Sequence, residues 1–162
     1  MAERVTGVLF VCTGNICRSP TAEGVFRALA RRRGVLERLR IDSAGTHDYH
    51  VGAPPDARAV EHAARRGYDL TGIRARQISW SDFQQFDLIL GMDRGHLREL
   101  KAIAPPGSLW RIAKFLDHSE NWRGLDVPDP YYGDGRGFEE VLDMVEEASA
   151  RLLEEIVAGF QR

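Results

Sequence analysis

The sequence has few cysteines, no long apolar run and no excess of one charge. Two cysteines in 162 residues exclude a framework of structural disulfides of the kind that small secreted domains use. No apolar segment approaches the roughly 18 residues of a membrane span, and the run at 8–11 is too short for a signal peptide. The net charge of −2 provides no global basic field for nucleic acid. We therefore expect a cytoplasmic protein that binds neither membranes nor nucleic acid.

What is present is the composition of an ordinary folded domain. Hydrophobic residues make up 43% of the chain and charged residues 28%, which is typical of globular proteins. A chain of this length can enclose one hydrophobic core, and no internal repeat or low-complexity linker divides it. The sequence therefore predicts a single domain over residues 1–162.

Short apolar runs alternate with amphipathic segments along the chain. The runs predict strands, and the segments between them predict helices. The expected strands are 8–11, 39–44, 87–92 and 110–115; the expected helices are 20–33, 56–66, 93–103 and 138–160, with a helical turn at 81–82. This β-α-β-α order implies an α/β fold, a Rossmann-like parallel twisted sheet with helices on both faces. Such sheets bind ligands at the carboxyl ends of their strands, where Cys12 lies.

The segment VCTGNICRSPTAEG (11–24) joins the first strand to the first helix. Backbone N–H groups in such a loop and first helical turn have no intrahelical partners, and they point into a concave site at the positive end of the helix. Gly14 and Asn15 allow the backbone to curl. Arg18 adds a planar fork of donors that suits phosphate oxygens. The sequence thus predicts a cradle of phosphate size.

Cys12 lies at the base of this cradle, where the positive field favours its nucleophilic thiolate form. Ser19 is placed to donate a hydrogen bond to that thiolate. A Cys-x4-Cys pair could also indicate a metal site, but no further cysteine follows Cys17. His47 and His50 lie in a loop rich in glycine and proline, not on a helix face. We therefore expect no metal and favour a cysteine nucleophile for phosphoryl transfer.

Expulsion of an ester oxygen is much easier with a general acid. The segment DVPDPYYGD offers three aspartates, Asp126, Asp129 and Asp134. Asp129 is the preferred candidate because prolines stiffen its loop, and because Tyr131 and Tyr132 could desolvate its carboxyl. Composition alone does not decide among the three.

These motifs together resemble the low-molecular-weight protein tyrosine phosphatase family. VCTGNICRSPTAE and DPYYGD carry the resemblance, and further matching pieces spread it over nearly the whole chain: IDSAGT (41–46), VGAPPDARAV, RARQ (74–77) and FDLILGMD (86–93). The resemblance implies a four-stranded parallel sheet, the phosphotyrosine protein phosphatase I-like fold. It also implies hydrolysis of phosphotyrosine with no metal or organic cofactor.

The resemblance assigns roles to individual residues. Cys12 would form a phosphocysteine intermediate, Arg18 would bind the phosphoryl oxygens, and Asp129 would act as general acid and then general base. The phosphate-binding loop would comprise Thr13, Gly14, Asn15, Ile16, Cys17 and Ser19. Ser43 would support the loop together with Asn15. Cys17 would pair reversibly with Cys12 under peroxide and so protect it.

Specificity is expected from aromatic side chains at the rim. The candidates are Tyr49, Tyr131 and Tyr132, with His47 and Ile16 nearby. A deep slot would suit the long phosphotyrosine side chain and hold phosphoserine too far from the floor. Tyr132 could instead be a core or loop-anchoring residue. Ile73 stands before the ARQ element where some family members carry a histidine, so the support of the loop is expected to differ there.

Three other functions compete with this interpretation. Arsenate reductases share the fold and the Cys-x5-Arg loop but need further cysteines, and protein-arginine phosphatases carry threonine in place of Ile16. A non-catalytic phosphotyrosine-binding module would not need its nucleophile and acid.

The expected partners are phosphotyrosine proteins, such as a bacterial tyrosine kinase or a host protein, bound by a monomer or weak dimer. Tyr131 and Tyr132 could themselves be phosphorylated.

Overall fold

The computed structural model describes residues 4–160; the ends of the expected domain, 1–3 and 161–162, lie outside the described residues. Four parallel strands form one sheet in the order β2-β1-β3-β4. The strands are β1 (Thr6–Cys12), β2 (Leu39–Gly45), β3 (Leu88–Gly91) and β4 (Ile112–Lys114). The α/β fold class with a four-stranded parallel sheet is confirmed.

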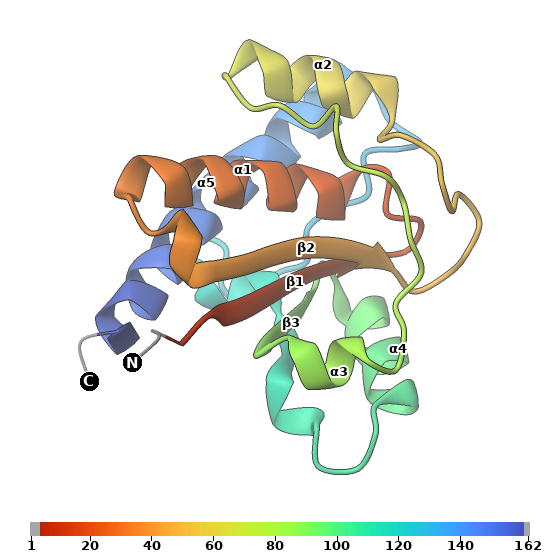
Figure 1. Cartoon of the computed structure of the whole chain (residues 1–162). Coiled ribbons are helices and arrows are strands. Elements are labelled where there is room, and N and C mark those ends of the chain that lie inside the picture. The colour runs from red at the N-terminus through yellow and green to blue at the C-terminus, as the bar shows by residue number, and fades with distance from the viewer. Residues whose placement is uncertain (1–3, 161–162) are drawn as a thin grey trace.

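Helices cover both faces of this sheet (Figure 1). One face packs against α1 (Arg18–Arg33) and α5 (Gly135–Phe160), and α2 (Ala57–Arg65) lies on α5. The other face carries α4 (Arg94–Ile103), beside the short α3 (Asp82–Gln85). The layers are therefore helix, sheet, helix, as the alternating sequence pattern predicts.

Three short 3₁₀ helices also occur between residues 4 and 160: η1 (Leu36–Arg38), η2 (Leu109–Arg111) and η3 (Phe115–His118). Two of them, η2 and η3, shorten the fourth strand that the sequence predicted. The fourth strand, expected over 110–115, is shorter, because only Ile112–Lys114 pair with β3 and 3₁₀ turns take up both ends. The last helix begins at Gly135 and not at 138, since the Asp134 carboxylate accepts a hydrogen bond from the Arg136 N–H and caps it.

The strand that carries Cys12 is buried on both faces. Val8 and Phe10 point into the core under α1 and α5, and Leu9 and Val11 point into the second core under α4. All four are fully buried, and the Phe10 ring makes edge contacts with Phe26 at 5.6 Å between ring centroids. Burial of side chains of this size stabilises the fold by about 1.5–3 kcal/mol each. Cys12 therefore ends a rigid element.

The order of the strands fixes where a ligand can bind. The chain passes from β1 through α1 to β2 on one side, and later places β3 on the other side of β1. The carboxyl end of β1 is thus a topological switch point, where open α/β sheets form their ligand-binding crevice. Cys12 is the last residue of β1.

Candidate active site

The loop that the sequence predicts to bind phosphate, residues 13–17 and called the phosphate-binding loop below, connects β1 directly to α1. Cys12 and Arg18 flank it and are 3% and 5% exposed. Asn15 adopts a left-handed backbone with φ of 58°, which folds the loop back on itself. Within the described chain, no backbone N–H of residues 14–17 donates a hydrogen bond. These N–H groups lie at the positive end of α1 and are available to an anion.

Asn15 maintains the shape of the loop from a fully buried position. Its Nδ2 donates to Ser19 Oγ at 2.8 Å and to Ser43 Oγ at 2.9 Å, and its Oδ1 accepts from the Arg76 N–H at 3.0 Å. Ser43 Oγ in turn donates to Glu23 Oε1 at 2.6 Å. The network accounts for both polar atoms of the Asn15 amide and brings Asn15 and Ser43 together, as the family resemblance implies.

The Ser19 hydroxyl lies 2.9 Å from Cys12 Sγ. Because Ser19 Oγ already accepts from Asn15, its own hydrogen is free to point at the sulfur. A hydrogen bond donated to a thiolate stabilises its charged form. The structure thus places Ser19 where the sequence pattern predicts it.

Arg18 is anchored by one nitrogen. Its Nη1 donates to Asp93 Oδ2 at 2.8 Å and to the Val127 carbonyl at 2.9 Å. Its Nη2 lies 3.8 Å from Asp129 Oδ2, and neither Nη2 nor Nε donates a hydrogen bond to a residue between 4 and 160. The guanidinium is therefore held in place while two of its nitrogens remain available to phosphoryl oxygens.

The structure distinguishes Asp129 from the other two aspartates of its loop. Asp126 is bound by Lys114 at 3.0 Å; burial acts to raise its pKa, but this hydrogen bond and the nearby cations hold it below the usual value. The hydrogen bond from Arg136 likewise lowers the pKa of Asp134. Asp129 alone of the three faces Arg18. Among the three, the position of Asp129 beside Arg18 favours it as the general acid, and this role stays a prediction.

The expected desolvation of Asp129 by the tyrosine pair is wrong. The Asp129 side chain is 41% exposed, and Tyr132 is 87% exposed. The Tyr131 ring lies edge-on to Tyr132 at 5.0 Å and beside the Arg58 guanidinium, so the pair does not cover the carboxyl. Tyr132 is consequently neither a core residue nor a buried anchor, and it is accessible at the surface.

Two aromatic pairs project from separate loops of the carboxyl-end region. His47 and Tyr49 stack with ring centroids 4.9 Å apart and nearly parallel planes, and His47 Nε2 pairs with Glu99 at 3.2 Å. The His47 N–H also binds the Thr13 carbonyl at 3.0 Å, so this loop is attached to the phosphate-binding loop. On the Asp129 loop, Tyr131 and Tyr132 form the second pair. Half-buried Ile16 belongs to the phosphate-binding loop itself.

Four site residues are not evident from the sequence: Glu23, Asp93, His96 and Val127. Asp93 lies two residues after the end of β3, at the same end of the sheet as Cys12, and that position was a usable signal. Val127 acts through its carbonyl, which no side-chain pattern reveals. His50 also gains a role, because a Cβ at Gly14 would lie 2.8 Å from its ring. A larger residue at position 14 would therefore displace the His50 ring, which is distant in sequence.

Ile73, which departs from the family pattern, is 9% exposed and joins the hydrophobic core. It contributes no polar contact to the loop. Ser43 instead donates to Glu23, whose other oxygen accepts from Arg27 at 2.6 Å. The network beneath the loop therefore rests on a buried carboxylate and an arginine.

Cys17 has a different environment from that of Cys12. It is 5% exposed and, like Cys12, a free thiol. Burial, followed by the negative charge of Asp56, raises the pKa of the Cys17 thiol to about 12. Cys17 therefore stays protonated at neutral pH, which makes it a poor nucleophile.

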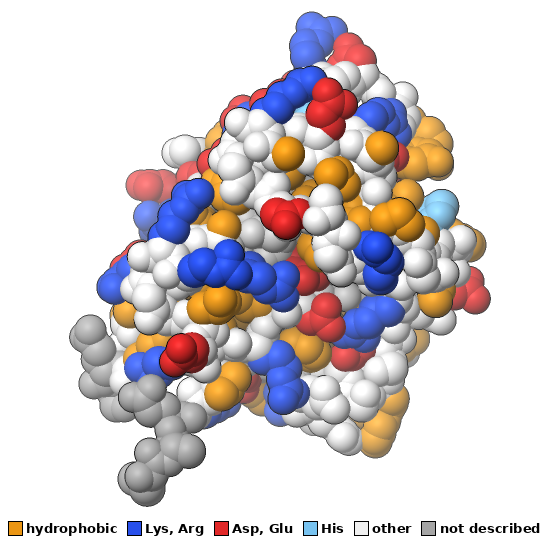
Figure 2. Space-filling model, turned by 45° about the horizontal axis from the view of Figure 1, so that its top comes forward, with side chains coloured by type: hydrophobic (Ala, Val, Ile, Leu, Met, Phe, Trp, Pro, Cys, Tyr) orange, Lys and Arg blue, Asp and Glu red, His pale blue; other side chains and the backbone are white. Residues whose placement is uncertain are grey.

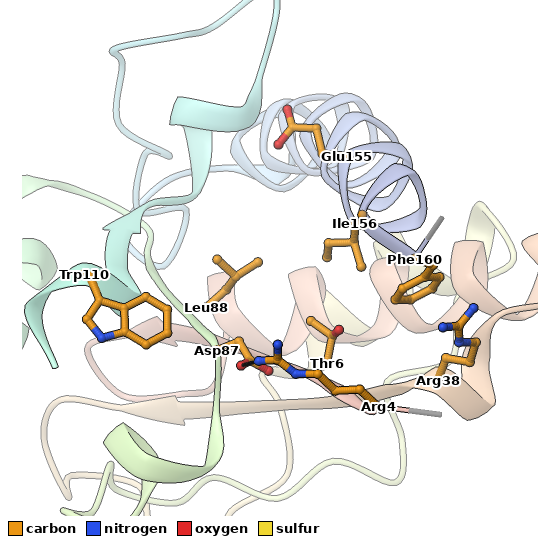
Figure 3. A pocket seen from close by; sticks show the side chains of 10 residues that line it. Arg4, Thr6, Arg38, Asp87, Leu88, Trp110, Glu155, Ile156 and Phe160 are labelled. Atoms are coloured by element: carbon orange, nitrogen blue, oxygen red, sulfur yellow. Dashed lines mark hydrogen bonds and ion pairs between the residues drawn. The ribbon is translucent and has the colours of Figure 1, made fainter. Parts of the chain in front are cut away.

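An apolar hollow of about 490 Å³ lies at the other end of the sheet, between β3, η2 and the end of α5 (Figure 3). Leu88, Trp110, Ile156 and Phe160 line it. Thr6, the first residue of β1, also borders it, whereas Cys12 is the last. Seven strand residues separate the two ends by about 20 Å. The hollow is therefore not part of the Cys12 site.

The comparisons with known proteins agree with this site. Residues 7–162 match the family described as low molecular weight phosphotyrosine protein phosphatase. The chain belongs to this family. It is 47% identical over 149 residues to the low molecular weight protein-tyrosine-phosphatase of Streptomyces coelicolor, with 90% of each chain covered. It is 43% identical over 143 residues to the human low molecular weight phosphotyrosine protein phosphatase, covering 87% of this chain and 90% of that one.

A solved structure has the same fold. The protein tyrosine phosphatase of Entamoeba histolytica, crystallised with Hepes in its active site, matches with a TM-score of 0.92 and 38% identity. The match covers 95% of this chain and 98% of that one. Like its relatives, this member of the low-molecular-weight phosphatase family is an enzyme.

Two properties of the described chain bear on its surroundings. No helix between residues 4 and 160 is long and apolar enough to cross a membrane. On the face over α1 and α2 that Figure 2 presents, Lys and Arg side chains are interspersed with Asp and Glu. That the protein does not bind nucleic acid stays a prediction.

Proposed function

We propose that this phosphatase hydrolyses phosphotyrosine and small aryl phosphates through a phosphocysteine intermediate on Cys12. One observation carries the proposal: the Cys12 thiol, the unpartnered N–H groups of 14–17 and the anchored Arg18 guanidinium converge at the start of α1. Together they can bind a phosphate dianion against a nucleophile, with no positive charge from a cofactor. Asp129 is beside Arg18, where a leaving group would emerge.

In the first step, the Cys12 thiolate attacks phosphorus. The bond between phosphorus and the tyrosyl oxygen breaks, and its electron pair stays on that oxygen, which takes the proton of Asp129. Arg18 Nε and Nη2 and the loop N–H groups bind the equatorial oxygens as their charge develops. The dephosphorylated tyrosyl hydroxyl (or the phenol of a small aryl phosphate) and the phosphocysteine result.

In the second step, the Asp129 carboxylate removes a proton from water, and the water oxygen attacks phosphorus. The sulfur–phosphorus bond breaks, and its electron pair returns to Cys12, where the Ser19 hydroxyl stabilises the thiolate. Inorganic phosphate leaves, and Asp129 is protonated again. The sum of both steps is hydrolysis of one phosphate monoester by one water.

We infer the substrate class from the depth of the Cys12 thiol and from the aromatic side chains on the loops around it. Cys12 is almost fully buried, and exposed aromatic side chains stand on the loops around it: Tyr49 at 68% and Tyr131 at 40% exposed. Aromatic faces of this kind can contact a substrate ring by stacking or edge contacts, which contribute about 0.5–1.5 kcal/mol per pair. A phosphoserine side chain is shorter and has no ring to fill the space.

Turnover of p-nitrophenyl phosphate by purified protein, at mildly acidic pH with a reducing agent, tests the activity. We expect release of nitrophenol, together with a kcat/KM for a phosphotyrosine peptide at least about 100-fold above that for its phosphoserine counterpart, the factor that about 2.7 kcal/mol supplies. Absence of product would remove the enzymatic proposal and leave a binding module. Equal rates on both peptides would contradict the role of the aromatic rim.

Cys17 is proposed as a protective redox partner. Peroxide oxidises the Cys12 thiolate to a sulfenic acid and is reduced to hydroxide; Cys17 sulfur then displaces the hydroxyl as water and forms a disulfide. The Cys12 charge is one of the influences that raise the Cys17 pKa. Burial and the charge of Asp56 are larger influences, so loss of the Cys12 charge on oxidation lowers the Cys17 pKa only in part, in the direction that favours attack.

Cys17→Ser should leave kcat/KM within about threefold of the parent, because Cys17 makes no contact with the nucleophile's hydrogen bonds. After a peroxide pulse, dithiothreitol should restore most activity of the parent and much less of the variant, since unprotected sulfenic acid proceeds to irreversible forms. Residual activity before and after reduction is the measurement. Equal recovery of both proteins would exclude the protective role.

Two features support phosphotyrosine over the competing reactions. Cys12 and Cys17 are the only cysteines, whereas arsenate reduction needs further ones to pass a disulfide along. Ile16, in place of threonine, and the adjacent Tyr131 and Tyr132 favour an aryl phosphate over phosphoarginine. We propose phosphotyrosine proteins of the cytoplasm as partners, with the enzyme acting as a monomer or weak dimer.

A further inference from the structure

His96 lies in the first turn of α4 and is 2% exposed. It forms a reciprocal pair with the helix cap, Asp93. The His96 N–H donates to Asp93 Oδ1 at 2.9 Å, and the Asp93 N–H donates to His96 Nδ1 at 3.2 Å. Glu or Gln usually fills the third helical position of such a capping box. A histidine there has a second ring nitrogen to use elsewhere.

That second nitrogen reaches the phosphate-binding loop. His96 Nε2 lies 2.9 Å from Thr13 Oγ1. Because Nδ1 accepts a hydrogen bond from Asp93, the ring proton is on Nε2, which therefore donates to Thr13. Burial, followed by the nearby positive charge of Arg18, lowers the pKa of His96 to about 4. The ring is thus neutral near neutral pH and keeps this tautomer.

The same ring is connected to the phosphate-binding arginine. Asp93 presents Oδ1 to the His96 N–H and Oδ2 to Arg18 Nη1, at 2.9 and 2.8 Å. Thr13 follows the nucleophile Cys12 directly in the chain. His96 therefore spans two structures that contact a phosphoryl group: the start of the loop, through Thr13, and the guanidinium, through Asp93.

We propose that His96 is a positioning residue of the phosphatase, which sets the spacing between the Thr13 end of the phosphate-binding loop and the Asp93-bound Arg18. The proposal rests on the proposed function, because it concerns the geometry in which Cys12 attacks phosphorus. A displacement of about 1 Å in such a constellation can lower a rate about 100-fold.

Three variants test it with p-nitrophenyl phosphate. His96→Leu removes both ring contacts, and we expect kcat to fall about 10-fold or more and KM to rise about fivefold, the smaller of the two changes. His96→Gln is the rescue variant, because its amide oxygen can accept from the Asp93 N–H and its NH₂ can donate to Thr13. It should stay within about threefold of the parent. Thr13→Val removes only the acceptor of His96 and should reproduce part of the loss.

Coupling between the two side chains is the decisive readout. In the Thr13→Val/His96→Leu double variant, kcat/KM should lie within about threefold of His96→Leu alone, since the second change removes nothing further. Three results would each overturn the proposal. The first is a double variant whose loss in kcat/KM is the product of the two single losses. The others are a His96→Leu variant with kcat within twofold of the parent, and a folded His96→Gln variant with kcat as low as that of His96→Leu. If His96→Leu does not fold, an unimpaired Thr13→Val variant would overturn it as well.

Binding of inorganic phosphate, followed by calorimetric titration, separates this proposal from the enzymatic one. If the parent binds phosphate but never turns over an ester, the proposed function fails on its own. The affinity of His96→Leu and His96→Gln for phosphate then decides the role of His96. We expect the dissociation constant for phosphate to be about fivefold higher for His96→Leu than for the parent, and unchanged for His96→Gln. Equal affinity of all three proteins would refute the positioning role.

Discussion

Cys12→Ser is expected to lower kcat on aryl phosphates by at least about 10⁴-fold, to the level of the buffer reaction, as is seen when a covalent nucleophile is removed. A serine hydroxyl is a much weaker nucleophile than a thiolate unless a base activates it. Ser19, whose Oγ lies 2.9 Å from the sulfur and accepts a hydrogen bond from Asn15, is no base. The measurement is steady-state release of nitrophenol.

The same variant should remain folded and bind phosphate. Cys12 ends a strand that is buried on both faces, and serine is a close steric match for cysteine. The thermal unfolding midpoint and the phosphate affinity therefore serve as controls. Residual turnover above about 1% in a protein that passes both controls is incompatible with Cys12 as the nucleophile.

Asp129→Ala is expected to lower kcat about 10²–10⁴-fold for phenyl phosphate, whose leaving group needs a proton. The loss should be much smaller for an ester with a good leaving group, such as p-nitrophenyl phosphate, because that oxyanion departs unprotonated. Comparison of kcat across a series of aryl phosphates gives the dependence on leaving-group pKa. The dependence should be steeper for the variant than for the parent.

Asp134→Ala is the matched control, since Asp134 lies in the same loop region but pairs with Arg136. It should leave the leaving-group dependence unchanged. An equal loss on all esters in Asp129→Ala would point to another acid, and a steeper dependence in the Asp134 variant would identify it. The Asp129→Ala protein is also suited to trap substrates from the native cell and so to identify the physiological partners.

The local conformation of the site follows from the sequence, while the roles of its residues stay predictions. Cys12, the cradle and Arg18 belong to one strand–loop–helix segment, whose backbone geometry is set by Asn15 and by the helix start. Contacts within a few residues depend on local rules, and these rules apply without knowledge of the rest of the chain. The strands and helices were predicted for the same reason, and the errors occurred at their ends, as at Trp110 and Gly135.

Residues that act from a distance were not predicted, or were predicted only by resemblance. Asp93 and His96 look like an ordinary helix cap in the sequence, and nothing local indicates that one binds Arg18 and the other Thr13. The buried carboxylate of Glu23 likewise resembles any helical glutamate until Ser43 and Arg27 are seen beside it.

The sequence by itself determined the α/β fold and the strand–loop–helix segment that we propose binds phosphate, because periodicity and a Cys-x5-Arg loop after a buried strand are local patterns. The tertiary structure alone decided which aspartate faces Arg18, which side chains fix the guanidinium, and that Cys17 is buried beside Asp56. The physical reason is that hydrogen bonds and electrostatic effects depend on distances of a few ångströms. Sheet order sets those distances, because it brings the end of β1 next to the end of β3.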